Sequence, residues 1–336
     1  MSRELAIIEL IAQMTGQRQP LSDDAFWDVT TRQIYTTDML VAGRHFDLAY
    51  FSPQDLGWKA AAVNISDLAA MGGTLRYLLI SLGLPSTPEL DLNWIRGLYE
   101  GFGEACQRFG GQIAGGDTVG SDQLVINVTA VGSCPVGHTP GHRYAAQPGD
   151  YIIATGFHGL SAVGLQTLRS GGAEQASYPA SRAAHLRPMP RVEVGFLLSR
   201  RFERYALMDS SDGLADALLK IAQASGQRLV VNEASLPVHP EVQAYVQAQG
   251  GEHTLLRNTI LYGGEDFELV GTVPEVDDAL LQSVHVLGRV EAANGSPGAW
   301  LNTAESASAS ESLIPLSMAQ TYQHFSASPE GSAHGA

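Results

Sequence analysis

The segment Asn64-Ile65-Ser66-Asp67-Leu68-Ala69-Ala70-Met71-Gly72-Gly73 predicts a buried helix that ends beside a carboxylate. Its apolar residues recur three or four positions apart, which is typical of a helix packed against a core. Gly72 and Gly73 then stop the helix. Asp67 is therefore expected close to a core, where a carboxylate is costly unless it caps a helix or binds a cation.

Similar acidic residues recur along the chain, each flanked by Gly, Ser or Thr. They are Asp23, Asp24, Asp38, Asp117, Asp209 and Asp212. Most follow a short apolar run that predicts the end of a strand. Hard oxygen ligands that converge from strand ends are what Mg²⁺ requires. A single Asp at a helix start is often only an N-cap, but the repetition favours metal sites over caps.

Composition excludes several classes of protein. The formal charge of −15 argues against nucleic acid or an anionic membrane as a partner. It does not argue against a phosphate substrate, because bound Mg²⁺ would reverse the local field. Cys106 and Cys134 give no disulfide framework, no apolar run is long enough to span a membrane, and the first residues lack a signal-peptide pattern. We therefore expect a cytoplasmic protein.

Lysine occurs only at positions 59 and 220. Neither lies in a phosphate-binding loop of the G-x-x-x-x-G-K-[ST] type, and the protein-kinase motifs are missing from the sequence. Any phosphate chemistry must therefore rely on metals, backbone N–H groups and arginine.

The order of predicted elements indicates an α/β (α+β) fold with two mixed-sheet domains. We expect domains at 1–137 and 138–325, joined by the Pro- and Gly-rich stretch Cys134–Gly149, and a tail at 326–336 with the composition of a disordered segment. The predicted helices cover 4–16, 53–72, 92–109, 159–169, 192–200 and 214–225. The predicted strands cover 33–37, 77–84, 124–132, 151–155, 205–208, 228–232, 267–273 and 285–290.

An ordered set of motifs over residues 21–325 resembles the thiamine-monophosphate kinase family, of the aminoimidazole-ribonucleotide-synthetase-like superfamily. The motifs are Asp23-Asp24-Ala25, Thr36–Phe46, Lys59–Gly72, Gly115–Thr118, Gly149-Asp150, His185–Arg191, Asp209–Leu214, Gly263–Leu269 and Tyr322–Phe325. The most specific are the segments around His45 and Glu265. One departure is Ser22, where the family usually has Gly before its first Asp pair.

The resemblance implies transfer of the ATP γ-phosphoryl group to thiamine monophosphate, which gives thiamine diphosphate and ADP. It implies several Mg²⁺ ions, and a homodimer whose N-terminal domains form a β-barrel-like interface. The acceptor phosphate oxygen is already anionic near neutral pH. We therefore expect direct in-line transfer, with no covalent nucleophile and no general base, and Mg²⁺ to offset repulsion between the two polyanions.

The resemblance also implies roles for individual residues. The implied metal ligands are Asp24, Thr36, Thr37, Asp38, Asp67, Asp117, Asp209 and Asp212; the two threonines could ligate through hydroxyl or carbonyl oxygen. The implied ATP contacts are Gly115, Gly116, Asp117, Arg143, Ser211 and Tyr99. The implied thiamine contacts are His45, Glu265 and Tyr322, because a carboxylate and an aromatic ring suit a cationic heterocycle.

Each role has an ordinary structural alternative. His45 could be an exposed loop residue, Arg143 a solvated surface charge and Tyr99 a packing residue. Two alternatives also concern the whole chain. It could be another ATP-dependent synthetase of the superfamily, acting on a ribonucleotide amide, selenide or a carbamoyl group. It could instead be a non-catalytic protein that binds nucleotide or metal, although the acidic motifs are intact.

Overall fold

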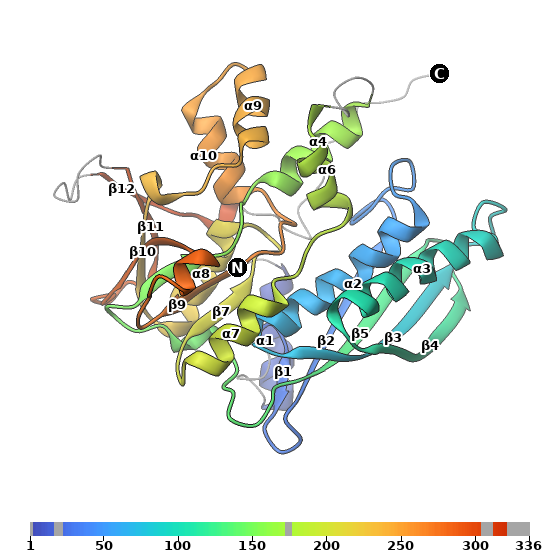
Figure 1. Ribbon diagram of the computed structural model, residues 1–336, viewed down its shortest axis with the longest axis horizontal. Helices are drawn as coiled ribbons and strands as arrows, with labels where there is room; N and C mark the ends of the chain where they lie inside the picture. Colours follow the sequence, from blue (N-terminus) through green and yellow to red (C-terminus); the bar gives the residue numbers. More distant parts are fainter. Residues whose placement is uncertain (1–2, 17–22, 172–176, 304–311, 321–336) are drawn as a thin grey trace.

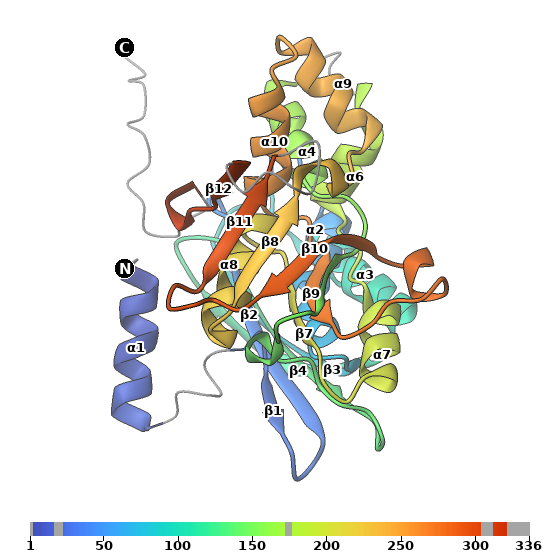
Figure 2. The same cartoon turned by 90° about the vertical axis from the view of Figure 1, so that its left-hand side faces the viewer.

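The computed structural model describes residues 3–16, 23–171, 177–303 and 312–320, and the side chains from residue 6 onward. Within these residues two mixed sheets lie side by side, each with helices packed against it (Figures 1 and 2). Helix α1 (Arg3–Thr15) lies apart from the rest of the chain in the view of Figure 2. In the described part of the chain, no helix is long and apolar enough to cross a membrane.

The N-terminal part builds a five-stranded sheet in the described residues. Its strands, in spatial order, are β1 (Phe26–Asp28), β2 (Gln33–Val41), β5 (Val125–Ser133), β3 (Thr74–Leu84) and β4 (Gln112–Gly120). Only β3 and β4 pair in parallel. Helices α2 (Pro53–Ala70) and α3 (Leu92–Phe109) pack together on one face of the sheet (Figure 1).

Helix α2 has the predicted start and end. The hydroxyl of Ser52 caps it by accepting a hydrogen bond from the Asp55 N–H, and Pro53 occupies its first turn. After Met71 the chain turns at Gly72, where φ is +65° and an added Cβ would lie 2.5 Å from Ser199 Cβ. Nearly every residue of α2 is buried, because the helix packs between its own sheet and the C-terminal part of the chain.

The C-terminal part builds a seven-stranded sheet in the described residues. Its strands, in spatial order, are β12 (Leu313–Pro315), β11 (Gly298–Asn302), β8 (Arg228–Asn232), β10 (His285–Glu291), β6 (Tyr151–Ala154), β9 (Leu269–Val273) and β7 (Ala206–Asp209). The helices are α4 (Leu160–Ser170), α6 (Pro179–Leu186), α7 (Val192–Arg201), α8 (Leu214–Ser225), α9 (Pro240–Ala248) and α10 (His253–Tyr262). Short 3₁₀ turns lie at Arg143–Ala145, Glu233–Ser235, Leu280–Gln282 and Met318–Gln320.

The face of the five-stranded sheet opposite α2 and α3, here called the open face, carries apolar side chains. Side chains alternate between faces along a strand, so the residues next to the buried positions of β2 and β3 point outward, as do the β4 residues in register with them. Among them, Met39, Tyr77, Leu79 and Val119 are 39–56% exposed. Apolar patches of this kind often mark a protein–protein contact.

Three strand predictions need correction. Asp38 is not at a strand end, because β2 continues to Val41. Asp117 lies inside β4, a strand that the glycine-rich sequence concealed. The predicted strand 77–84 begins three residues earlier, because β3 runs from Thr74 to Leu84; it lies inside the sheet, whose described edges are β1 and β4.

Candidate functional site

Three carboxylates from distant parts of the chain meet where α2 touches the C-terminal sheet. Asp24 precedes β1, Asp67 lies in the last turn of α2, and Asp209 ends β7. One oxygen from each lies within 4.8 Å of the other two. We call these residues the acid cluster. Its oxygen donors are the type that Mg²⁺ prefers, so the residues present fit that ion.

The electrostatics of the acid cluster favour the binding of a cation. Burial raises the pKa of Asp67 well above its ordinary value, and the neighbouring charges of Asp38, Asp209 and Asp24 raise it further. Burial raises the pKa of Asp209 as well, and the charges of Asp24 and Asp38 raise it further. Carboxylates are not stable in this arrangement without protons or a bound cation.

Two neighbours on β2 complete the surroundings of Asp67. The Thr36 hydroxyl donates to Asp67 Oδ2 at 2.5 Å. Asp38 lies on the same side of β2, where its backbone N–H donates to the Asn64 side chain at 3.1 Å. Five implied ligands, Asp24, Thr36, Asp38, Asp67 and Asp209, therefore gather at one place.

Helix capping does not explain Asp67. It lies near the C-terminal end of α2, where the helix dipole disfavours a negative charge. Asp212 does not cap α8 either, because the N-cap position is Gly213 and no side chain accepts a hydrogen bond there; the Asp212 carboxylate instead lies 3.4 Å from Lys220 Nζ.

Arg143 is held at the acid cluster, so it is not a freely solvated surface charge. Its guanidinium donates to both oxygens of Asp24, at 2.7 and 3.3 Å. Burial opposes the charged form of Arg143, but Asp24 and the other acids raise its pKa overall. Asp23 fixes this turn, because it accepts from the Arg143 N–H at 2.8 Å and contacts His142 Nδ1 at 2.9 Å.

Two implied ligands lie on the other side of the five-stranded sheet. Asp38, Val128, Ile80 and Gly116 occupy one row across the strands, and Val128 and Ile80 are buried. Asp117 is in the next row, so it faces the opposite way. Thr37 also faces that way, and its hydroxyl accepts from the Asn127 side chain at 3.2 Å. Thr37 and Asp117 therefore share the open face and are not part of the acid cluster.

The remaining implied nucleotide contacts are dispersed. Gly115 and Gly116 lie on the exposed edge strand β4. Ser211 follows the acid cluster residue Asp209 in the chain, and its carbonyl accepts from the Glu265 N–H at 2.6 Å. Tyr99 is a partly buried residue of α3 whose ring lies 5.8 Å from that of Phe102. Tyr322 lies outside the described residues.

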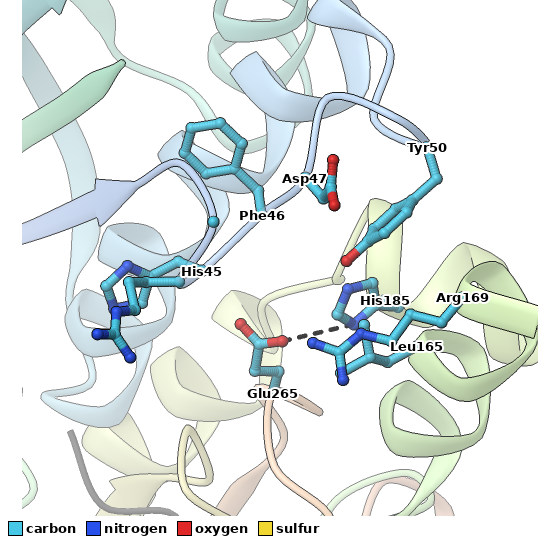
Figure 3. A pocket seen from close by; sticks show the side chains of 10 residues that line it. His45, Phe46, Asp47, Tyr50, Leu165, Arg169, His185 and Glu265 are labelled. Atoms are coloured by element: carbon cyan, nitrogen blue, oxygen red, sulfur yellow. Dashed lines mark ion pairs between the residues drawn. The ribbon is translucent and has the colours of Figure 1, made fainter. Parts of the chain in front are cut away.

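A pocket that the Glu265–Ser211 hydrogen bond links to the loop after Asp209 is lined by His45 and Glu265, which the sequence predicted as thiamine contacts (Figure 3). The loop after β2 supplies one wall, and α4 and α6 supply the other. The pocket is lined by Gly43, Arg44, His45, Phe46, Asp47, Tyr50, Leu165, Arg169, His185 and Glu265. The side chains of Tyr50, His185 and Glu265 converge in Figure 3. His45 is thus a pocket residue, although its loop is partly exposed.

Sequence reasoning gave no site role to the two pocket residues His185 and Arg169 or to Lys59 behind the pocket. His185 and Arg169 lie on helices whose pocket-facing sides could not be assigned without the packing. Lys59 is completely buried in α2 and reaches Glu265. The signal for Lys59 was available, since a lysine within an otherwise apolar, Ala-rich helix requires a partner.

Comparisons with known proteins give the family. Residues 22–134 match the family model described as AIR synthase related protein, N-terminal domain. A thiamine-monophosphate kinase from Bacillus subtilis (strain 168) is 41% identical, and the match covers 72% of each chain. The chain belongs to the thiamine-monophosphate kinase family. A second family member, from Aquifex aeolicus (strain VF5), is 32% identical over 87% of this chain and 92% of its own.

The fold is also that of the family. The solved structure "AaThiL complexed with AMPPCP and TMP" has a TM-score of 0.81 and 29% identity, and the match covers 96% of this chain and 97% of that one. The hydrogenase maturation protein HypE in complex with ATP has a TM-score of 0.68 over 91% of each chain, at 22% identity. That likeness concerns the fold alone. The family sequence match therefore favours kinase over the hydrogenase-maturation alternative.

Proposed function

We propose that this protein transfers the γ-phosphoryl group of ATP to thiamine monophosphate, giving thiamine diphosphate and ADP. The observation that carries the proposal is the acid cluster together with a pocket lined by His45 and Glu265, which the Glu265–Ser211 hydrogen bond links to the loop after Asp209. Membership of the thiamine-monophosphate kinase family supports the substrates. The solved structure "AaThiL complexed with AMPPCP and TMP", which has the same fold, also supports them.

The acid cluster, with Thr36 and Asp38 beside it, would hold Mg²⁺. When bound, Mg²⁺ supplies positive charge that offsets repulsion between phosphate groups and stabilises the transferring phosphoryl group. Thr37 and Asp117 stay proposed ligands, but at a separate position because they share the open face. Asp212, paired with Lys220, is proposed as a ligand at the nucleotide end.

The residues of the chain would align the reactants without supplying a nucleophile. The acceptor oxygen of thiamine monophosphate is already anionic, so a base is not needed to create it. Ser161 and His185 do form a hydrogen-bonded pair at 3.0 Å. Both are buried, and burial lowers the pKa of His185 to about 2, so this pair is not arranged as an exposed nucleophile. Direct in-line transfer follows.

The two substrates would meet across the loop Asp209–Asp212. The pocket would take the heterocyclic part of thiamine monophosphate, with Tyr322 as a further contact. The hydrogen bond from Glu265 N–H to Ser211 carbonyl joins the pocket floor to the acidic loop. ATP would approach from the other side, where we propose contacts from Arg143 and Ser211. Tyr99, Gly115 and Gly116 stay proposed nucleotide contacts, but at separate positions on α3 and β4.

We also propose a cytoplasmic homodimer with a division between two domains at 137/138. The open face supports the dimer, because pairing of two copies would cover Met39, Tyr77, Leu79 and Val119. Such pairing would place the strand-rich faces of two N-terminal domains together in a barrel-like arrangement.

Product analysis tests the proposed function. The protein is incubated with ATP and Mg²⁺ and either thiamine monophosphate or free thiamine. We expect thiamine diphosphate from the first substrate and little phosphorylation of the second, because an alcohol needs a base that the proposed site does not offer. Equal or faster phosphorylation of free thiamine would refute the proposal.

A further inference from the structure

Directly behind the pocket residue Glu265 lies a buried lysine that the proposed chemistry does not use. The Lys59 side chain has no exposed surface, and its ammonium group forms an ion pair with Glu265 Oε1 at 3.1 Å. The ring of Phe51 lies 5.2 Å from the same ammonium group. A buried ammonium group is costly unless it is paired, so the contact with Glu265 fixes both side chains.

Glu265 is held rigidly at the pocket surface. Its backbone adopts φ of +64°, a left-handed conformation that is unfavourable for a residue other than glycine. Its N–H donates to the Ser211 carbonyl at 2.6 Å, and its side chain is 31% exposed. His185 Nδ1 lies 3.4 Å from its second carboxylate oxygen (Figure 3). Because burial keeps His185 neutral, the charged partner of Glu265 among these two contacts is Lys59.

The charges around the pocket do not favour a cation. Three cationic side chains, Lys59, Arg44 and Arg169, lie on or directly behind its wall, against two carboxylates, Asp47 and Glu265. A positively charged ring would therefore gain little net attraction here. A neutral ring with an N–H donor would still gain a hydrogen bond from the exposed part of the Glu265 carboxylate.

We propose that Lys59 is a positioning residue that presents Glu265 as a charge-balanced hydrogen-bond acceptor for the neutral aminopyrimidine of thiamine monophosphate. The inference rests on the proposed function and refines it. It replaces our expectation that Glu265 acts as a counter-ion for the cationic ring. The thiazolium ring and its phosphate then lie outside the contact with Glu265, toward the acid cluster.

A double-mutant cycle tests the role of Lys59. The variants Lys59→Met, Glu265→Gln and the double variant are compared by kcat and by KM for each substrate. Arg201→Met, which removes a cation paired with Asp277 outside the pocket, is the matched control. We expect KM for thiamine monophosphate to rise roughly tenfold or more in Lys59→Met and in Glu265→Gln, while their KM for ATP stays unchanged. Both KM values should stay unchanged in the control variant Arg201→Met. KM for thiamine monophosphate in the double variant should be no higher than in the more affected single variant, because both substitutions break the same contact.

Two kinetic results would overturn the inference while leaving the proposed function intact. One is an unchanged KM for thiamine monophosphate in an active Lys59→Met protein. The other is a fold-increase in KM for the double variant that equals the product of the two single-variant increases, which would show that Lys59 and Glu265 act independently. Failure of the wild-type protein to make thiamine diphosphate would instead refute the proposed function, so the two failures are distinguishable.

Fragment competition keeps the inference testable if Lys59→Met does not fold. The free aminopyrimidine alcohol and the N-methylated thiazolium alcohol are titrated against thiamine monophosphate, with wild type and Glu265→Gln. We expect the neutral aminopyrimidine to compete, and its inhibition to weaken in Glu265→Gln, while the thiazolium is unaffected by the substitution. The inference would be overturned if the thiazolium inhibited the wild type more strongly than the aminopyrimidine and Glu265→Gln abolished that inhibition.

Discussion

Replacing Asp67 by Asn should stabilise the metal-free protein, which is the opposite of the usual effect of a buried substitution. Two unit charges no more than 4.8 Å apart repel by at least about 3.5 kcal/mol at an effective dielectric constant of about 20. Asp67 faces two such neighbours, and the wild type avoids part of the cost by taking up protons. Arg143 also offsets the Asp24 charge. We therefore expect a net gain of about 1–3 kcal/mol in the free energy of unfolding.

The gain should depend on pH with a defined sign. The pKa of Asp67 is raised in the folded state, so this group costs stability as pH rises above its ordinary value of 3.8. The free energy of unfolding of Asp67→Asn should therefore exceed that of the wild type by more at pH 8 than at pH 5. The Thr36 hydroxyl can still donate to the Asn side-chain oxygen, so that hydrogen bond is retained.

Urea unfolding with and without Mg²⁺ measures both consequences. The wild type should gain about 2.7 kcal/mol when free Mg²⁺ is a hundredfold above its dissociation constant. The variant should lose most of that response and most of its turnover. Asp91→Asn is the control, because Asp91 caps α3 through the N–H groups of Asn93 and Trp94 and Asn caps equally well. An Asp67→Asn protein that is less stable without Mg²⁺, yet responds to Mg²⁺ like the wild type, would refute the reasoning.

Three further predictions concern stability and assembly. Burial lowers the pKa of His158 to about 3 from its ordinary 6.5, so the unfolded chain binds a proton more readily than the folded protein, and acidification below pH 6.5 destabilises the fold. In urea unfolding, the wild type should lose about 2 kcal/mol in the free energy of unfolding between pH 6.5 and 5 because of His158, and His158→Leu should not show this loss. Gly116→Ala should lower the free energy of unfolding by about 1–3 kcal/mol, seen as a lower melting temperature, because its Cβ would lie 1.7 Å from the Ile80 carbonyl oxygen. Gly120→Ala should leave the melting temperature unchanged, because the space around Gly120 is open. Leu79→Lys on the open face should shift sedimentation from dimer to monomer, and a monomeric wild type at micromolar concentration would refute the proposed dimer.

Local patterns in the sequence predict most of the fold. The α2 boundaries follow from a capping serine, a proline and two glycines, which act within a few residues of one another. The α8 and β8 boundaries match the expected 214–225 and 228–232 for the same reason. Strand β4 was missed because its glycines have low strand propensity, and only pairing with β3 stabilises it.

The candidate site was predictable in its chemistry and less so in its geometry. The acidic motifs give Asp24, Asp67 and Asp209, which do meet. They could not reveal that Asp117 faces the other side of the sheet, because that depends on strand register. Lys59 and Glu265 are far apart in the sequence, and only tertiary packing brings them within 3.1 Å.

Following the labelled γ-phosphoryl group of ATP tests the central proposal most directly. The protein is mixed with γ-labelled ATP, Mg²⁺ and thiamine monophosphate, and the label is measured in the protein and in the small-molecule products over time. We predict that label enters thiamine diphosphate in equal amount to the ADP released, with none retained on the protein. Release of ADP without labelled thiamine diphosphate, or a labelled protein that passes its label to thiamine monophosphate, would contradict direct transfer at this site.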